Sequence, residues 1–92
     1  MNLENRDNLL AEIKKLPPEE AISNLDKLIM ETEASDELYF IRGMKHWALN
    51  HRQEAITDYL TAIKLNPESK AKMALQYSYD ILDYYNKDLL NP

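Results

Sequence analysis

The sequence predicts an all-α fold: an α-solenoid (α-α superhelix) of two helix-turn-helix repeats and one C-terminal capping helix, five helices in all. Three observations predict this fold. Residues 36–67 place apolar side chains at the three-to-four spacing of helices. A similar pattern occurs 34 residues earlier. The 92 residues contain one glycine and no cysteine, as suits a single helical domain without disulfides.

The two helical patterns of residues 36–67 are joined by a short polar break at Asn50-His51. The first pattern has two rows on different faces, namely Tyr39, Gly43 and His46, and Phe40, Met44 and Trp47. A helix that is apolar on two sides must be covered on both, so we expect it inside the molecule. The second pattern has one apolar stripe, formed by Ala55, Tyr59, Ala62 and Ile63, and leaves Asp58, Thr61 and Lys64 for water.

Gly43 lies in the middle of the first of these helices. Glycine there costs about 1 kcal/mol relative to alanine, so a packing reason is expected. Two helices that cross closely need a residue without a Cβ atom. We therefore expect Gly43 at a helix crossing, with Ala55 and Ala62 as its small partners.

The order of these residues resembles a tetratricopeptide repeat. The matching residues are Tyr39, Gly43, His46, Ala55, Tyr59, Ala62 and Pro67. The sequence departs from the family pattern at Arg42, where leucine is usual, and at His46, where tyrosine is usual. Asn50 stands where the turn often has glycine. The resemblance implies a repeat over residues 36–69.

A degenerate first repeat is predicted over residues 2–35. Residues 20–25 match residues 54–59 at an offset of 34, the tetratricopeptide period. The first helix would run from Asn2, its cap, to Lys15, with an apolar stripe of Leu9, Leu10, Ile13 and Leu16.

Prolines separate the two helices of this first repeat. The residue before a proline is pushed out of helical geometry, so Leu16-Pro17 ends the first helix. Pro18 suits the first turn of the second helix, which we expect to end near Thr32.

Residues 68–89 are predicted to form the capping helix. Asn66 would cap it, and Pro67 would take its first helical position. One row would cover the open end of the second repeat: Ala71, Ala74, Leu75, Ser78, Ile81, Leu82 and Tyr85. The ending, residues 81–88, resembles the terminus of some small bacterial two-repeat proteins. Residues 1–92 would then be one domain.

Charge and hydropathy exclude several classes of protein. The net charge of −5 argues against nucleic-acid binding, which needs a basic face. We interpret the densest basic stretch, residues 42–52, as a solvated helix end. Residues 1–10 lack the apolar core of a signal peptide, and no apolar run approaches the ~20 residues of a membrane span. We therefore expect a cytoplasmic protein.

Catalytic and metal sites are not expected. His46 and His51 are five residues apart, so they would not lie on the same face of a helix. The sequence has no cysteine and no third histidine to complete a set of metal ligands. Asp80 and Asp83 have a spacing seen in acid–base pairs, but we interpret them as a solvated helix face. There is no phosphate-binding loop and no nucleophile with a recognisable base. We predict a protein that is not an enzyme and has no cofactor.

The tetratricopeptide resemblance implies a partner-binding groove lined by the first helix of each repeat. By repeat register the groove residues would be Arg6, Leu10, Ile13, Phe40, Met44, Trp47, Ala48, Ala74 and Ser78. Some family members hold the C-terminal carboxylate of a partner there, between polar side chains. In this chain Phe40 and Met44 stand in place of those polar side chains, so binding of a carboxylate is disfavoured. The apolar floor with Trp47 favours an apolar or amphipathic segment. Alternatively, Phe40, Met44 and Trp47 are buried as core.

Two classes of function follow. The first is a protein–protein interaction module that binds a partner peptide or helix in the groove. The alternative is a structural, self-associating protein, a homodimer that buries the apolar groove or the last helix, with Tyr77, Tyr84, Leu89 or Leu90 as the candidate dimer patch. We expect a monomer or weak dimer, because the last helix can cap the repeats within one chain. An RNA-binding helical repeat is disfavoured by the acidic charge balance.

Overall fold

The protein forms five helices. The structure, a computed structural model, describes residues 3–33 and 35–90, with side chains for 6–33 and 35–84. The helices are α1 (Leu3–Lys15), α2 (Pro18–Glu31), α3 (Asp36–Ala48), α4 (Arg52–Leu65) and α5 (Ala71–Leu90). No strand occurs in these residues, so the prediction of an all-α protein with five helices is confirmed. Asn2, the predicted first cap, lies outside the described residues.

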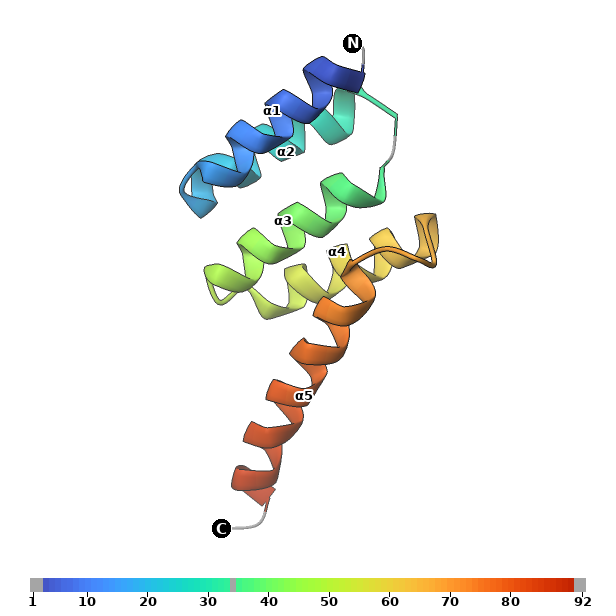
Figure 1. The fold of residues 1–92 in the computed structure, drawn as a ribbon. Helices are drawn as coiled ribbons and strands as arrows, with labels where there is room; N and C mark the ends of the chain where they lie inside the picture. The colour runs from blue at the N-terminus through green and yellow to red at the C-terminus, as the bar shows by residue number, and fades with distance from the viewer. Residues whose placement is uncertain (1–2, 34, 91–92) are drawn as a thin grey trace.

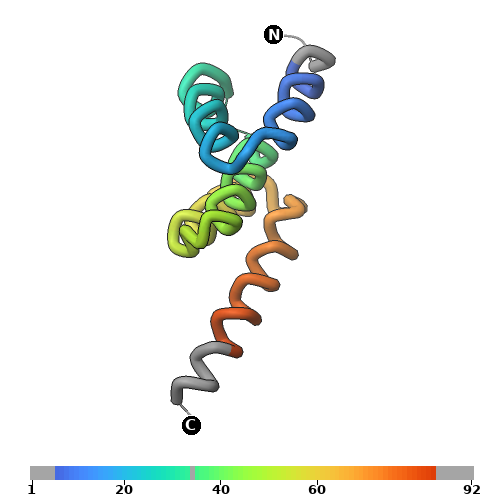
Figure 2. The backbone as a smooth tube through the Cα atoms, turned by 90° about the vertical axis from the view of Figure 1, so that its left-hand side faces the viewer, coloured from blue at the N-terminus to red at the C-terminus, as the bar shows by residue number. Residues whose placement is uncertain are grey.

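The third helix is central in the molecule (Figure 1). It packs against α2 on one side and against α4 on the other, and it also contacts α5. After α4 ends, a loop returns the chain to the side of α4, where the fifth helix begins and then extends away from the other helices (Figures 1 and 2). The molecule is therefore elongated, with extents of 53 × 27 × 18 Å. As predicted, α3 is covered on more than one side.

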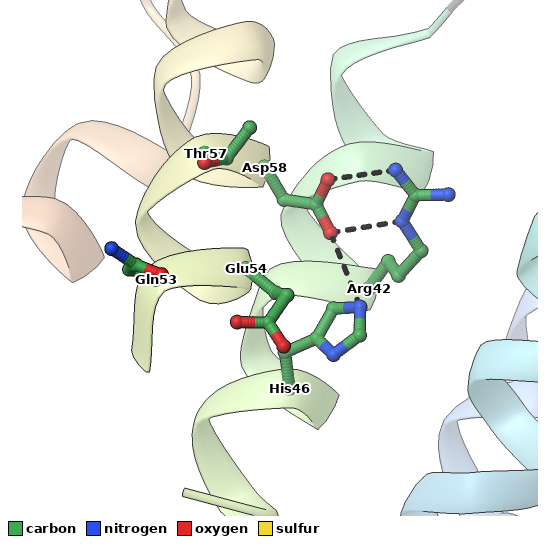
Figure 3. Close-up of a pocket in the computed structure, with 6 residues that line it drawn as sticks. All are labelled: Arg42, His46, Gln53, Glu54, Thr57 and Asp58. Atoms are coloured by element: carbon green, nitrogen blue, oxygen red, sulfur yellow. Dashed lines mark hydrogen bonds and ion pairs between the residues drawn. The ribbon is translucent and has the colours of Figure 1, made fainter. Parts of the chain in front are cut away.

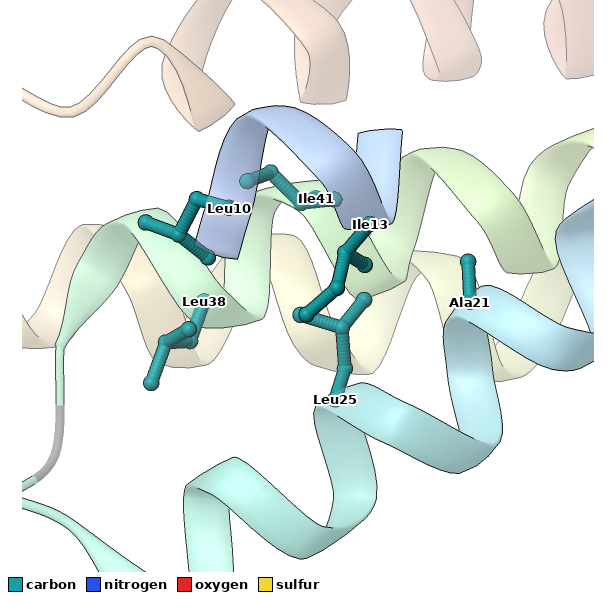
Figure 4. Packing of buried hydrophobic residues seen from close by; sticks show 6 residues of the cluster. All are labelled: Leu10, Ile13, Ala21, Leu25, Leu38 and Ile41. Carbon is teal, nitrogen blue, oxygen red and sulfur yellow. The ribbon is translucent and has the colours of Figure 1, made fainter. Parts of the chain in front are cut away.

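One hydrophobic cluster joins the first three helices (Figure 4). Its buried members are Leu10, Ile13, Ala21, Leu25, Leu38 and Ile41. Leu9 and Leu16 pack against this cluster, so the predicted stripe of the first helix does form an apolar contact surface. The cluster closes α1 and α2 onto the start of α3.

A second cluster joins α4 to the start of α5. Ala55, Tyr59, Ala62 and Ala71 are buried in it, and Ile63 packs against them. Gly43 is buried on the facing side of α3. A Cβ atom at Gly43 would lie 2.6 Å from Tyr59 Cε1 and 3.2 Å from the Ala55 oxygen. The predicted close crossing is present, with the Tyr59 ring rather than Ala62 against the glycine.

The capping helix begins later than predicted. Asn66 Oδ1 accepts a hydrogen bond from the Glu68 amide (3.0 Å), which stabilises a turn rather than a helix. The Ala71 amide donates to Ser69 Oγ (3.1 Å), and α5 starts there. The prediction of a helix from residue 68 with Pro67 at its first position was wrong, because this local turn satisfies the backbone groups first.

Only the first half of α5 covers the rest of the fold. Ala71 and Ser78 are buried, whereas Ile81 and Leu82 are half-buried and Tyr84 is 64% exposed. The side chain of Tyr85, the last member of the predicted row, lies outside the described residues. In the described part of the chain, none of the helices is both long and apolar enough to cross a membrane.

Candidate functional site

A groove of about 320 Å³ lies where α3, α4 and α5 meet. Its walls are mostly apolar, and one charged side chain, Lys70, lines it. The lining residues are Phe40, Met44, Trp47, Tyr59, Lys70, Met73, Ala74, Tyr77 and Ser78. A concave, mainly apolar surface with few polar groups is typical of a binding site.

The groove is open to solvent along one side. Met44 is 49% exposed, Met73 81% and Tyr77 64%, whereas Phe40 and Trp47 are half-buried. These values favour an open groove over the alternative that Phe40, Met44 and Trp47 are all core. The guanidinium carbon of Arg52 lies 5.2 Å from the centre of the Trp47 ring, within reach of a cation–π contact. Arg52 and Lys70 thus place positive charge beside an apolar surface.

The structure brings together only some of the predicted groove residues. Phe40, Met44, Trp47, Ala74 and Ser78 line this groove, although Ser78 is 2% exposed and donates its hydroxyl to the Ala74 oxygen (2.8 Å).

Four other predicted groove residues lie elsewhere. Leu10 and Ile13 are each 2% exposed, because their side of α1 packs on α2 and α3, so a partner cannot reach them. Arg6 lines a separate hollow with α2, and its Nη2 atom has no hydrogen-bond partner in the described part of the chain. Ala48 is exposed outside the groove.

The sequence reasoning missed four residues of the groove: Tyr59, Lys70, Met73 and Tyr77. Met73 and Tyr77 are four residues apart, so they lie on one helix face next to Ala74. Their spacing in the sequence could therefore have identified Met73 and Tyr77 as neighbours of Ala74 in the groove. The tetratricopeptide register points to the first helix of each repeat and to the last helix, so it gave no reason to expect Tyr59 of α4 in the groove.

A polar cluster lies between α3 and α4 (Figure 3). Arg42 donates from Nε to Asp58 Oδ2 (2.9 Å) and from Nη2 to Asp58 Oδ1 (2.8 Å). A third bond runs from Nη1 to Asp26 Oδ1 (2.9 Å). Asp58 is 4% exposed. The prediction that Asp58 is left for water was wrong, because Arg42 supplies a buried partner that periodicity does not reveal.

Two groups of this region titrate outside their ordinary ranges. Hydrogen bonds to Asp58 raise the pKa of Arg42 despite the opposing effect of burial. Burial, together with the Asp58 carboxylate, raises the pKa of Tyr59 to about 12. Arg42 therefore stays charged and Tyr59 stays neutral at any physiological pH.

The basic stretch of residues 42–52 is not simply solvated. Lys45 Nζ donates to the Lys14 oxygen (2.8 Å) and the Leu16 oxygen (3.2 Å), so it satisfies carbonyls at the end of α1. Arg42 is tied to Asp26 and Asp58. Much of the positive charge in this stretch therefore holds the fold together rather than facing a ligand.

The turn between α3 and α4 brings the two histidines together. His46 Nδ1 lies 3.3 Å from His51 Nδ1, and the ring centres are 5.5 Å apart. His46 Nε2 lies 3.9 Å from Asp58 Oδ2. The His46 side chain is largely buried, with an exposure of 17%.

The other candidate sites suggested by the sequence are shallow and do not enclose a ligand-sized space. Asp80 and Asp83 are exposed and line a shallow hollow with Gln76, whose Nε2 donates to Asp80 Oδ1 (3.0 Å). Among the residues described, no group of three His, Cys, Asp or Glu side chains could hold a metal ion. The groove between α3, α4 and α5 has, by contrast, a mainly apolar lining.

Comparison with known proteins does not assign the chain to a family. No family model, curated protein or solved structure matches it significantly.

Proposed function

We propose that the protein is a non-catalytic protein–protein interaction module with two tetratricopeptide-like repeats and a C-terminal capping helix. The periodicity of the helices supports the repeats. Each end of α4 follows the corresponding end of α2 by 34 residues, at positions 18 and 52 and positions 31 and 65. Ala21 and Leu25 are buried in α2, as are Ala55 and Tyr59 at the same offset in α4.

The partner would be an apolar or amphipathic segment, such as a helix, that binds in the groove between α3, α4 and α5. The observation that carries this proposal is the exposed apolar lining formed by Met44, Met73 and Tyr77 around the half-buried Trp47. Aromatic side chains and methionine are enriched in protein interfaces. With Arg52 and Lys70 beside it, the groove suits a segment with acidic residues at its flanks. A cytoplasmic location belongs to this proposal.

Trp47, the only tryptophan, makes the proposal testable. In the free protein its fluorescence should be partly quenched by acrylamide. A helical peptide selected from a displayed amphipathic library should shift the emission to the blue and protect it from quenching. Trp47→Ala should weaken this binding by ~2 kcal/mol or more, as expected for an aromatic anchor.

A matched control is Tyr79→Ala, because Tyr79 is 45% exposed on α5 and does not line the groove. That variant should bind the peptide as the wild type does. Unquenchable Trp47 emission in the free protein would contradict the proposal. So would a loss of ~3–5 kcal/mol of folding stability on Trp47→Ala, because that is the cost of removing a buried core aromatic.

The alternative function is a self-associating helical-repeat protein. One observation favours it: Tyr77 and Tyr84 are each 64% exposed on α5, which extends beyond the other helices. Leu89 and Leu90, the other members of the predicted dimer patch, have side chains outside the described residues. Molar mass in solution distinguishes this function from the first.

A further inference from the structure

We propose that His46 and His51 form a two-nitrogen binding site for a zinc-class transition-metal ion at the turn between α3 and α4. The site is separate from the groove, and the function proposed above does not use it. The spacing of these residues argued against a metal, since side chains five apart on a continuous helix point in different directions. The chain is not a continuous helix here, and the turn changes which side chains meet.

The backbone of the turn holds the two histidines together. Asn50 has a φ of 64°, in the left-handed region that asparagine tolerates better than most residues. The His51 amide donates to the His46 oxygen (2.8 Å), and the Asn50 amide donates to the Trp47 oxygen (2.9 Å). These two bonds define a Schellman motif, in which the residues in the positions of His46 and His51 are commonly in side-chain contact. The pair is therefore positioned by the helix end and not by the rings alone.

The distance between the ring nitrogens suits a tetrahedral ion. With Zn–N bonds of ~2.0–2.1 Å and a tetrahedral angle, two ligand nitrogens lie about 3.3–3.4 Å apart. The Nδ1 atoms of His46 and His51 are 3.3 Å apart. The two nitrogens are also within hydrogen-bond distance of each other, so a bound zinc ion would take the place of the proton between them.

A carboxylate lies near the second ring nitrogen of His46. Metal-binding histidines usually direct that nitrogen to a carboxylate or a carbonyl oxygen. His46 Nε2 lies 3.9 Å from Asp58 Oδ2, beyond hydrogen-bond distance, and both oxygens of Asp58 accept hydrogen bonds from Arg42. In the neutral tautomer with its proton on Nε2, His46 would present the Nδ1 lone pair on the side of His51.

The remaining coordination positions would be taken by water or another small ligand. The His51 side chain is exposed, so this side of the pair is open to solvent. Imidazole without thiolate suits zinc, nickel or copper and disfavours magnesium or calcium.

Zinc titration of the tag-free protein, followed by NMR, tests the site. The chain has only two histidines, so each ring signal can be assigned by substitution. Both sets of ring signals should shift together along one saturation curve, and the melting temperature should rise with zinc concentration. His51→Gln should fold normally, because His51 is exposed, and should bind zinc at least tenfold more weakly.

Two substitutions at Asn50 separate the role of the turn from that of the rings. Asn50→Gly keeps the left-handed conformation accessible and should retain zinc binding, whereas Asn50→Val strains it and should weaken binding severalfold. Ring signals that do not move in millimolar zinc would overturn the proposal. Equal zinc affinity of His51→Gln and wild type would also overturn it, since the ion would then be bound elsewhere.

Discussion

At the scale of single residues, Gly43 determines how closely α3 approaches α4. An added Cβ atom would lie 2.6 and 2.8 Å from two ring atoms of Tyr59, which is 3% exposed and has little room to move. Gly43→Leu should therefore destabilise the fold by roughly 1–3 kcal/mol through overpacking. Chemical denaturation measures this difference.

The Gly43 prediction has an internal control. Gly43→Ala gains about 1 kcal/mol of helix propensity, which the clash with Tyr59 opposes. In a Tyr59→Ala background the clash with the ring is absent and only the 3.2 Å approach to the Ala55 oxygen remains, so Gly43→Ala should be clearly less unfavourable there than in the wild-type background. An unchanged unfolding midpoint for Gly43→Leu in the wild-type background would show that this crossing is not tightly packed.

Tyr59 also makes stability depend on pH at the alkaline end. Burial raises its pKa to about 12 in the folded protein, against 10.0 in the unfolded chain. Below about pH 10 both states keep the proton, and this group's contribution to stability is fully present. As the pH rises from 10 towards 12, the unfolded state loses the proton first, so the free energy of unfolding falls by up to ~1.4 kcal/mol per pH unit.

Urea unfolding between pH 9 and 12 measures this dependence. Tyr59→Phe cannot ionise, so its stability should fall less steeply over the same range. Parallel curves for the two proteins would contradict the assignment of this pH dependence to Tyr59.

At the scale of secondary-structure elements, Arg42 ties α3 to both neighbouring helices. Its bonds to Asp58 reach α4, and its bond to Asp26 reaches α2. The two acids differ in environment, with side-chain exposures of 5% for Asp58 and 54% for Asp26. The two pairs should therefore differ in their contributions to stability.

Arg42→Met should destabilise the protein by ~3 kcal/mol or more, because it leaves a buried carboxylate without a partner. Asp26→Asn should cost at most ~1 kcal/mol, since exposed ion pairs contribute little. The double variant Arg42→Met with Asp58→Leu should recover much of the loss, because no buried charge remains. Equal effects of Arg42→Met and Asp26→Asn in thermal unfolding would show that Asp58 is well solvated.

At the scale of the whole molecule, the path of α5 determines how much of its surface is left exposed for self-association. Its first half closes the second hydrophobic cluster, and the remainder leaves Tyr84 64% exposed. We expect a monomer at micromolar concentration with weak self-association above it, because part of the capping row is already covered within one chain. Sedimentation equilibrium should show this concentration dependence, and Tyr84→Ala should reduce it. A tight dimer at micromolar concentration would favour the self-associating alternative.

Local rules determined much of this molecule from sequence. Pro17 and Pro18 separate α1 from α2 because proline restricts the residue before it and fits the first helical turn. Apolar periodicity identified the buried side of α1 and α4, including Leu10, Ile13 and Ala55. A glycine in the middle of a helix indicated a close crossing. These features depend on neighbours within a few residues, which the sequence contains.

The tertiary structure alone decided three features of the candidate sites. Asp58 is buried because Arg42 reaches it from α3, across 16 residues of sequence. His46 and His51 meet because Asn50 adopts a left-handed conformation that ends α3. Met73 and Tyr77 join Trp47 in the groove because α5 starts at Ala71 and takes its direction from that point. The first and third features depend on where whole helices lie relative to one another, and the second depends on the conformation of one turn; helical periodicity contains neither kind of information.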